Sequence, residues 1–126
     1  MAKTWSGLRT WSVGVLLASF CIGTLAVPRP VAAAPTITIT VVNSGARAID
    51  GLYLSLYADR GWGPDQLNGV ALAPGASVVL SNVACTTSSI VVIGEDEGGC
   101  FLYRSVACSG DAAWTITSNA ARDCGR

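Results

Sequence analysis

The sequence predicts an all-β fold: a small antiparallel β-sandwich or barrel of about six strands, held by two disulfides. Apolar and polar residues alternate in several short runs, which is the two-residue period of a strand. Turn-forming residues recur about every 8 to 12 residues, and no stretch of useful length has the 3.6-residue period of a helix. Four cysteines follow the apolar N-terminal segment, an even number that favours two disulfides in an exported chain.

The first two predicted strands lie near the start of the domain. Residues 36–42, TITITVV, alternate Thr with Ile or Val. Residues 52–57, LYLSLY, place three leucines on one face and Tyr53, Ser55 and Tyr57 on the other. The connection between them, NSGARAIDG, contains the Asn, Ser and Gly that are typical of turns. We therefore expect these two strands to form the first hairpin.

The later strands are predicted from their turn signals. The Pro-Gly pair at 74 and 75 predicts a turn before a strand over residues 77–80. The runs SSIVVIGED and CFLYRSVAC flank the tripeptide EGG, whose glycines tolerate positive φ, so these runs predict a second hairpin. The tripeptide SGD, around Gly110, predicts one more hairpin turn into a last strand, AAWTITS.

The two later hairpins decide between the three possible disulfide pairings. If the EGG turn lies at the centre of its hairpin, the numbers of two residues that face each other across the hairpin sum to about 195. Cys108 then faces residue 87, which is two positions from Cys85. The next hairpin brings Cys100 close to the tail that carries Cys124. A Cys100–Cys108 bridge would have to span roughly 26 Å of one strand, far beyond the Cα separation of a disulfide. We therefore expect Cys85–Cys108 and Cys100–Cys124.

Residues 1–33 are predicted to be a cleaved secretory signal peptide, which leaves a single all-β domain over residues 34–126. Lys3 and Arg9 precede an apolar run of about fifteen residues, and small residues follow up to Ala33, the expected cleavage position. A membrane span needs roughly 20 apolar residues, so a retained membrane anchor is the weaker alternative. The expected location is secreted, either periplasmic or extracellular, with no membrane anchor after cleavage.

The composition of the predicted domain disfavours several classes of function. Residues 34–126 contain five Arg, no Lys, no His and eight acidic residues, so the net charge is −3. No nucleic-acid partner is expected, because phosphate binding scales with the number of cationic contacts. Without His or Lys, the domain can build neither a Ser–His–Asp triad nor a Schiff base. We expect no enzymatic activity and no cofactor.

Metal binding is also not expected. The cysteine spacing C-x14-C-x7-C-x15-C has no close pair, and a zinc site usually needs one, often with His. The acidic run EDE at 95–97 lies at a predicted hairpin tip, and no calcium-loop pattern surrounds it. Adjacent acidic residues on a strand also point to opposite faces.

The loop DRGWGPDQLNG, residues 59–69, contains the candidate binding residues, and two interpretations of it stay open. In one, Trp62 and Leu67 pack under the sheets and Asp65 caps a turn. In the other, Trp62 lies exposed between two glycines with acidic and amide side chains beside it, a combination that suits a sugar ring or a peptide. The candidate ligand-binding residues are Trp62, Asp59, Asp65, Gln66, Tyr53 and Tyr57.

A resemblance covers roughly residues 37–85. The stretches ITVVNSGARAIDGLYLSLY, WGPDQL and LAPGASVVL are similar to a group of small exported bacterial β-proteins, which share an L-Y-x-S strand, a W-G-x-D-x-L loop and an L-x-P-G-x-S turn. The group has no established activity, so the resemblance implies export and an all-β domain but no reaction. After Cys85 the chain departs from the group, because TTSS replaces the usual aromatic-Asp pair and the chain contains an extra cysteine pair.

Together these observations predict a secreted, non-catalytic, disulfide-bonded domain that acts as a binding or interaction module. The expected partner is a carbohydrate or a protein. Two alternatives are a structural envelope protein without a small ligand and a secreted inhibitor of another enzyme, which would present the loop GEDEGG.

Overall fold

The computed structural model describes residues 14, 23–56 and 61–125. It consists of two units, Met1–Val31 and Ala32–Arg126. Residues 23–35 are exposed and form neither helix nor strand. In the described ranges, no helix is long and apolar enough to cross a membrane. Most of the predicted signal peptide lies outside these ranges, so its cleavage stays a prediction.

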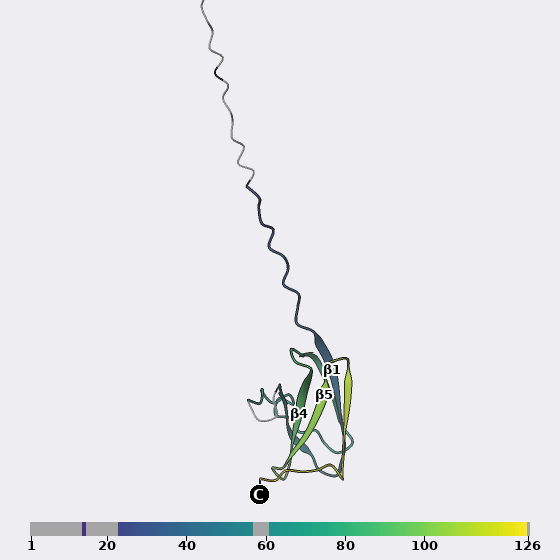
Figure 1. Ribbon diagram of the computed structural model, residues 1–126. Coiled ribbons are helices and arrows are strands. Elements are labelled where there is room, and N and C mark those ends of the chain that lie inside the picture. Colours follow the sequence, from purple (N-terminus) through teal and green to yellow (C-terminus); the bar gives the residue numbers. More distant parts are fainter. Residues whose placement is uncertain (1–13, 15–22, 57–60, 126) are drawn as a thin grey trace, which may run out of the picture. The chain divides into compact units, whose positions relative to one another are not determined.

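The second unit is a two-layered domain of β-strands, and the described residues contain no helix (Figure 1). One sheet has the order β3-β1-β6 and the other the order β2-β4-β5. The predicted all-β class is therefore confirmed. The strands are β1 (Thr36–Ser44), β2 (Ile49–Ser55), β3 (Ser77–Ala84), β4 (Ser89–Asp96), β5 (Phe101–Ala107) and β6 (Ala112–Thr117).

The core lies between the inner faces of the two sheets. Strand β1 shows the predicted alternation, since every second residue from Ile37 to Asn43 is buried. Ile39 and Val41 from this sheet, and Leu52 and Val92 from the other, are completely buried. Burial of one face of each strand against the other sheet is the main source of stability in such a fold.

The predicted first hairpin is wrong, because β1 and β2 belong to different sheets. Strand β1 pairs with β3, and β2 pairs with β4. The chain turns the corner at Asn43, whose buried side-chain amide donates hydrogen bonds to the backbone oxygens of Arg47 (2.8 Å) and Leu72 (2.9 Å). Alternation identifies the buried face of a strand but not its neighbour, and strands facing each other across a core show the same pattern as strands paired side by side.

The predicted hairpin around Gly110 is also wrong. Strand β5 lies in one sheet and β6 in the other, where β6 runs parallel to β1. The backbone N–H of Thr38 donates to the carboxylate of Asp111 (2.8 Å), which fixes the start of β6 beside β1. The chain in fact changes sheet at every connection except the one between β4 and β5. Both sheets are otherwise antiparallel, as expected.

The predicted turns are confirmed where a few consecutive residues form the whole turn. Gly75 has φ of 84°, and the N–H of Ala76 donates to the oxygen of Ala73 (3.0 Å), which is the geometry of a type II turn with Pro74 and Gly75 at its centre. The β4–β5 hairpin is confirmed, with Gly99 at φ 75°. Its opposed residue numbers sum to 196 rather than 195, as in the pair Ser89 and Ala107.

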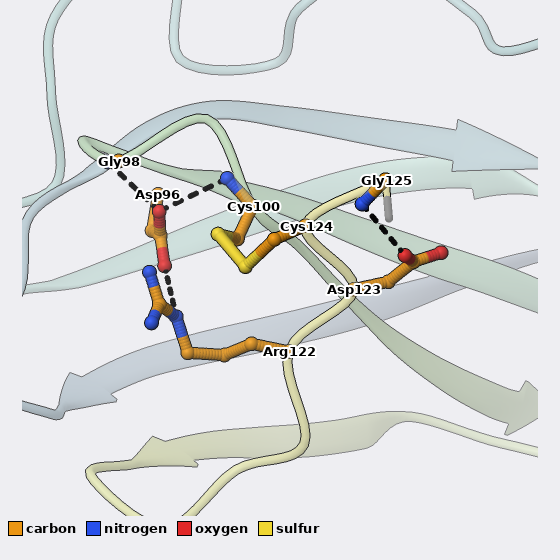
Figure 2. Close-up of a disulfide and its surroundings, with 7 residues drawn as sticks. All are labelled: Asp96, Gly98, Cys100, Arg122, Asp123, Cys124 and Gly125. Carbon is orange, nitrogen blue, oxygen red and sulfur yellow. Dashed lines mark hydrogen bonds and ion pairs between the residues drawn. A yellow bond between two sulfur atoms is a disulfide. The ribbon is translucent and has the colours of Figure 1, made fainter.

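Both predicted disulfides are present. Cys85 bonds to Cys108 with a Cα separation of 5.6 Å, and Cys100 bonds to Cys124 with a Cα separation of 4.2 Å. The second bridge ties the C-terminal tail to the start of β5 (Figure 2). Two disulfides are consistent with an oxidising, secreted environment.

Candidate ligand-binding surface

Three aromatic side chains gather on the outer face of the β2-β4-β5 sheet, and we call Tyr53, Trp62 and Phe101 the aromatic cluster. The ring centroids of Tyr53 and Trp62 are 5.5 Å apart, with the ring planes tilted by 34°. Phe101 meets Trp62 nearly edge-on, at 4.8 Å and 70°. Both geometries lie in the favourable range for aromatic pairs. Trp62 nevertheless keeps 39% of its surface exposed, so the cluster presents an aromatic face to solvent.

The position of Tyr53 depends on the glycine two residues before it. A Cβ atom at Gly51 would lie 2.5 Å from the Tyr53 hydroxyl and 2.9 Å from the ring, so the ring occupies the space that a side chain at position 51 would need. Its hydroxyl donates a hydrogen bond to the carboxylate of Glu95 (3.2 Å). Desolvation, reinforced by this hydrogen bond and by the negative charge, raises the pKa of Tyr53. The phenol is therefore a neutral donor at physiological pH.

A second, smaller apolar layer lies on this outer face. Ile93 is completely buried, yet it is not part of the core between the sheets, because it alternates with the inward-facing Val92. Its cross-strand neighbours are Tyr53 on β2 and Tyr103 on β5. Tyr103 is 44% exposed. Ile93 is therefore covered on the outer side of the sheet, next to tyrosines on both neighbouring strands.

The loop that carries Trp62 is attached to the edge of β2 by Asp65 and its neighbours. One carboxylate oxygen of Asp65 accepts hydrogen bonds from the N–H groups of Leu52 and Leu67 (both 3.0 Å), and the other accepts from Gly69 (3.1 Å). Partial burial raises the pKa of Asp65, but these three donors outweigh it and hold the pKa below its usual value. The N–H of Gln66 completes the attachment by donating to the oxygen of Leu52 (2.7 Å).

Each of the two interpretations of the loop fits some of its described residues. Leu67 is buried and Asp65 binds backbone groups, as the structural interpretation expects. Trp62 lies on the outer face with Tyr53, as the ligand-binding interpretation expects. The Gln66 side-chain amide donates to the oxygen of Pro64 (3.0 Å) and so has a local role. Asp59 and Tyr57 lie outside the described residues.

Phe101 and Glu95 complete the surface and were not predicted. Their positions face each other across the β4–β5 hairpin, so Glu95 on the central strand reaches Tyr53, whereas Phe101 on β5 joins the cluster through Trp62. The alternation of Phe101 and Tyr103 on β5 was a usable signal, since both side chains share one face. The contact between Phe101 and Trp62 could not be predicted from the sequence, because it depends on β4 being the central strand of its sheet.

The acidic run at 95–97 does not form a cluster. Glu95 points to the aromatic cluster, Asp96 points inward and bonds to Arg122, and Glu97 is exposed at the turn. In the part of the chain that the structure describes, no group of three or more His, Cys, Asp or Glu side chains is placed to hold a metal ion.

No protein-family model matches the chain, and no curated protein matches its sequence. Among solved structures, the chain is similar to one described as the NMR structure of the protein from Eubacterium rectale. The match has a TM-score of 0.45 and 14% identity, and it covers 71% of this chain and 85% of the other.

Proposed function

We propose that this protein is a secreted, non-catalytic binding domain, periplasmic or extracellular, whose aromatic cluster binds a carbohydrate. The observation that carries the proposal is the exposure of Trp62, a side chain held in a fixed orientation by two aromatic neighbours and still open to solvent. A side chain that served only to fill the domain would be buried, because an exposed Trp gains little from folding.

The polar neighbours of the cluster support a sugar rather than a purely apolar ligand. The C–H faces of a sugar ring pack on aromatic rings, and its hydroxyls need hydrogen-bond partners at the edge of the same surface. Glu95 supplies carboxylate oxygens, and Tyr53 supplies a phenol that remains protonated at neutral pH. The rigid attachment through Asp65 keeps the cost of ordering the loop low when a ligand binds.

The test is a titration of the oxidised domain, residues 34–126, with neutral hexasaccharides of β-linked glucose, xylose, N-acetylglucosamine and mannose. Trp62 and Trp114 are the only tryptophans in this range, and Trp114 is buried, so a change in emission reports on position 62. We expect saturable binding of one of these glycans and a loss of at least about tenfold in affinity for Trp62→Ala.

Val79→Ala is the matched control, because Val79 is an exposed apolar residue on β3 in the other sheet. It should leave the affinity unchanged. If none of the four glycans shows saturable binding, or if Val79→Ala weakens binding as much as Trp62→Ala does, the aromatic cluster is not a carbohydrate site. A protein partner would then be the remaining ligand class for this surface.

A further inference from the structure

A cavity of about 230 Å³ lies at the end of the domain opposite to the start of β1, and it is separate from the aromatic cluster. Strands β1, β2, β4, β5 and β6 each contribute to its lining. Ile49, Leu102 and Ile116 give it an apolar floor. Arg47 from the β1–β2 connection and Arg122 from the C-terminal tail line the same cavity, and we call it the arginine pocket.

Asp96 and the C-terminal tail hold Arg122 in place. The Asp96 carboxylate is 3% exposed and accepts a hydrogen bond from Nε of Arg122 at 2.6 Å. Its other oxygen accepts from the N–H groups of Gly98 (2.8 Å) and Cys100 (3.1 Å). These bonds use Nε of Arg122 and leave its two terminal nitrogens for other partners. Figure 2 shows this arrangement beside the Cys100–Cys124 disulfide, which fixes the tail.

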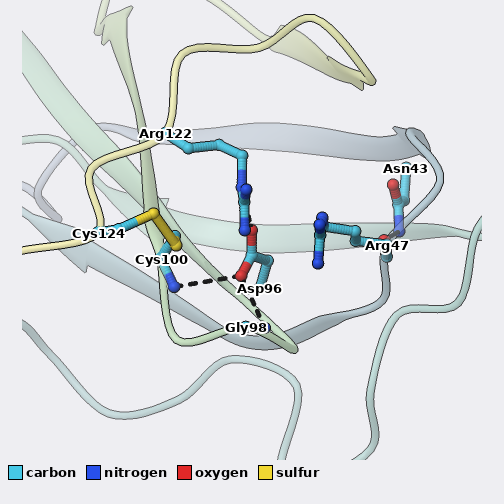
Figure 3. A network of polar contacts seen from close by, with 7 residues as sticks. All are labelled: Asn43, Arg47, Asp96, Gly98, Cys100, Arg122 and Cys124. Carbon is cyan, nitrogen blue, oxygen red and sulfur yellow. Dashed lines mark hydrogen bonds and ion pairs between the residues drawn. A yellow bond between two sulfur atoms is a disulfide. The ribbon is translucent and has the colours of Figure 1, made fainter.

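Arg47 approaches the same place from the β1–β2 connection. Its Nη1 and the Nη2 of Arg122 lie 3.7 Å and 3.2 Å from the position that a Cβ atom at Gly98 would occupy. Figure 3 shows its guanidinium turned toward the Asp96–Arg122 pair. Within the described residues, the Arg47 guanidinium makes no hydrogen bond or ion pair. Its backbone is nevertheless fixed, because the completely buried Asn43 amide bonds to the Arg47 oxygen.

The charges in the arginine pocket do not balance. Two guanidiniums converge, and Asp96 neutralises one of them, so the pocket carries one net positive charge in a domain whose net charge is −3. A guanidinium offers a planar pair of donors that fits the two oxygens of a carboxylate. The single excess charge matches one carboxylate, and the apolar floor suits a short hydrocarbon body.

We propose that the arginine pocket binds the carboxylate of a small organic acid, with the oxygens between Arg47 and Arg122 and the hydrocarbon part on the floor made by Ile49, Leu102 and Ile116. The volume, about that of seven or eight water molecules in the liquid, limits the ligand to a small acid or to one acidic end group of a larger molecule. Asp96 positions Arg122 and does not contact the ligand.

The experiment is an NMR titration of the ¹⁵N-labelled oxidised domain with propionate. The signals followed are the Nε–H groups of Arg47 and Arg122 and the backbone N–H of Gly98. Propionamide, which has nearly the same shape but no charge, is the ligand control. We expect saturable shifts with propionate, none with propionamide, and unchanged propionate binding in Trp62→Ala, because the aromatic cluster is a separate site.

Arg47→Gln is the informative variant, because this side chain has no partner in the described structure and its loss should leave thermal unfolding unchanged. Propionate affinity should fall by on the order of tenfold, the loss expected when a charge-assisted pair becomes a neutral one. Arg104→Gln makes the same charge change at an exposed β5 residue outside the pocket, and affinity should stay within about twofold.

Three results would overturn the proposal. The first is the absence of saturable shifts with propionate, and the second is an equal loss of affinity in Arg47→Gln and Arg104→Gln. The third is tighter binding of inorganic phosphate than of propionate, which would assign the pocket to a phosphate group instead of a carboxylate.

Discussion

Replacing Asp96 by Asn should destabilise the domain by about 3 kcal/mol at neutral pH. The variant keeps an oxygen for the N–H groups of Gly98 and Cys100, but it turns an N–H donor toward Nε of Arg122. A hydrogen bond between charged groups contributes about 1.5–3 kcal/mol. Because the Arg122 side chain is 31% exposed, we take about 2 kcal/mol for this bond. The two remaining bonds each weaken by about 0.5 kcal/mol when their acceptor becomes neutral.

The assays are urea unfolding and thermal unfolding of the oxidised domain, with Asp50→Asn as the control for loss of one exposed negative charge. A domain of this size loses about 4–8 °C in Tm for each kcal/mol, so the Tm of Asp96→Asn should fall by about 12–24 °C. Asp50→Asn should change stability by less than about 0.5 kcal/mol.

The pH dependence of the difference tests the cause. The hydrogen bond from Arg122, offset in part by burial, holds the pKa of Asp96 below its usual value of 3.8. A lowered pKa means that the ionised side chain stabilises the fold fully above pH 3.8, and that this contribution disappears as pH falls through the lower, folded-state pKa. Asp65 also has a lowered pKa, but it is present in both proteins and cancels in the comparison. A loss below about 0.5 kcal/mol at pH 7, or a difference that stays constant in acid, would refute this account.

Three further predictions concern the outer face of the β2-β4-β5 sheet and the tail. Gly51→Ala should displace the Tyr53 ring, because a Cβ atom has no room there, and Trp62 emission should shift to the red; an unchanged spectrum would contradict the packing of Tyr53 over the glycine. Ile93→Ala should cost about 2–4 kcal/mol in urea unfolding although Ile93 lies outside the main core, and a cost below 1 kcal/mol would mean that the outer layer is not closely packed. Replacing Cys100 and Cys124 together by Ser should lower stability by about 3 kcal/mol, and equal urea midpoints for variant and wild type would show that the tail is held by other contacts.

Local features of the fold were predictable from the sequence, whereas the neighbours of most strands were not. The β4–β5 hairpin and the turn at Gly75 are decided by a few consecutive residues, so their sequence signals were sufficient. The partner of β1 is decided by packing over the whole domain, because Ile39 and Val41 bury the same surface whichever strand lies beside them. Sheet order in a sandwich is a long-range property, and alternation contains no information about it.

The Cys100–Cys124 bridge was predicted correctly although one of the strand pairings used to reach it is wrong. Strand β6 does not return along β5; the tail after β6 does. Phe101 and Asp123 exchange two backbone hydrogen bonds, at 2.7 and 2.8 Å, and this short antiparallel bridge places Cys124 beside Cys100. The distance limits of a disulfide therefore predict which two positions lie close together, but they do not predict the path of the chain between those positions.

Trp62 and Tyr53 could be grouped from the sequence because both lie close to β2 in the chain. Phe101 could not, because it reaches the cluster only through the order β2-β4-β5. Asp65 fits the structural interpretation of the loop, since its oxygens bond to backbone N–H groups. Residue type alone does not separate these roles, because a carboxylate that caps a turn and one that contacts a ligand have the same chemistry.

The β4–β5 hairpin connects the two proposed sites through consecutive residues. Glu95 bonds to Tyr53 on the outer face, and Asp96 bonds to Arg122 in the arginine pocket. Because neighbouring residues of a strand point to opposite faces, a slip of one residue in this hairpin would exchange the two carboxylates and remove both sites at once. The Cys100–Cys124 bridge begins at the residue that closes this turn. Its position thus supports the register on which both sites depend, in addition to holding the tail.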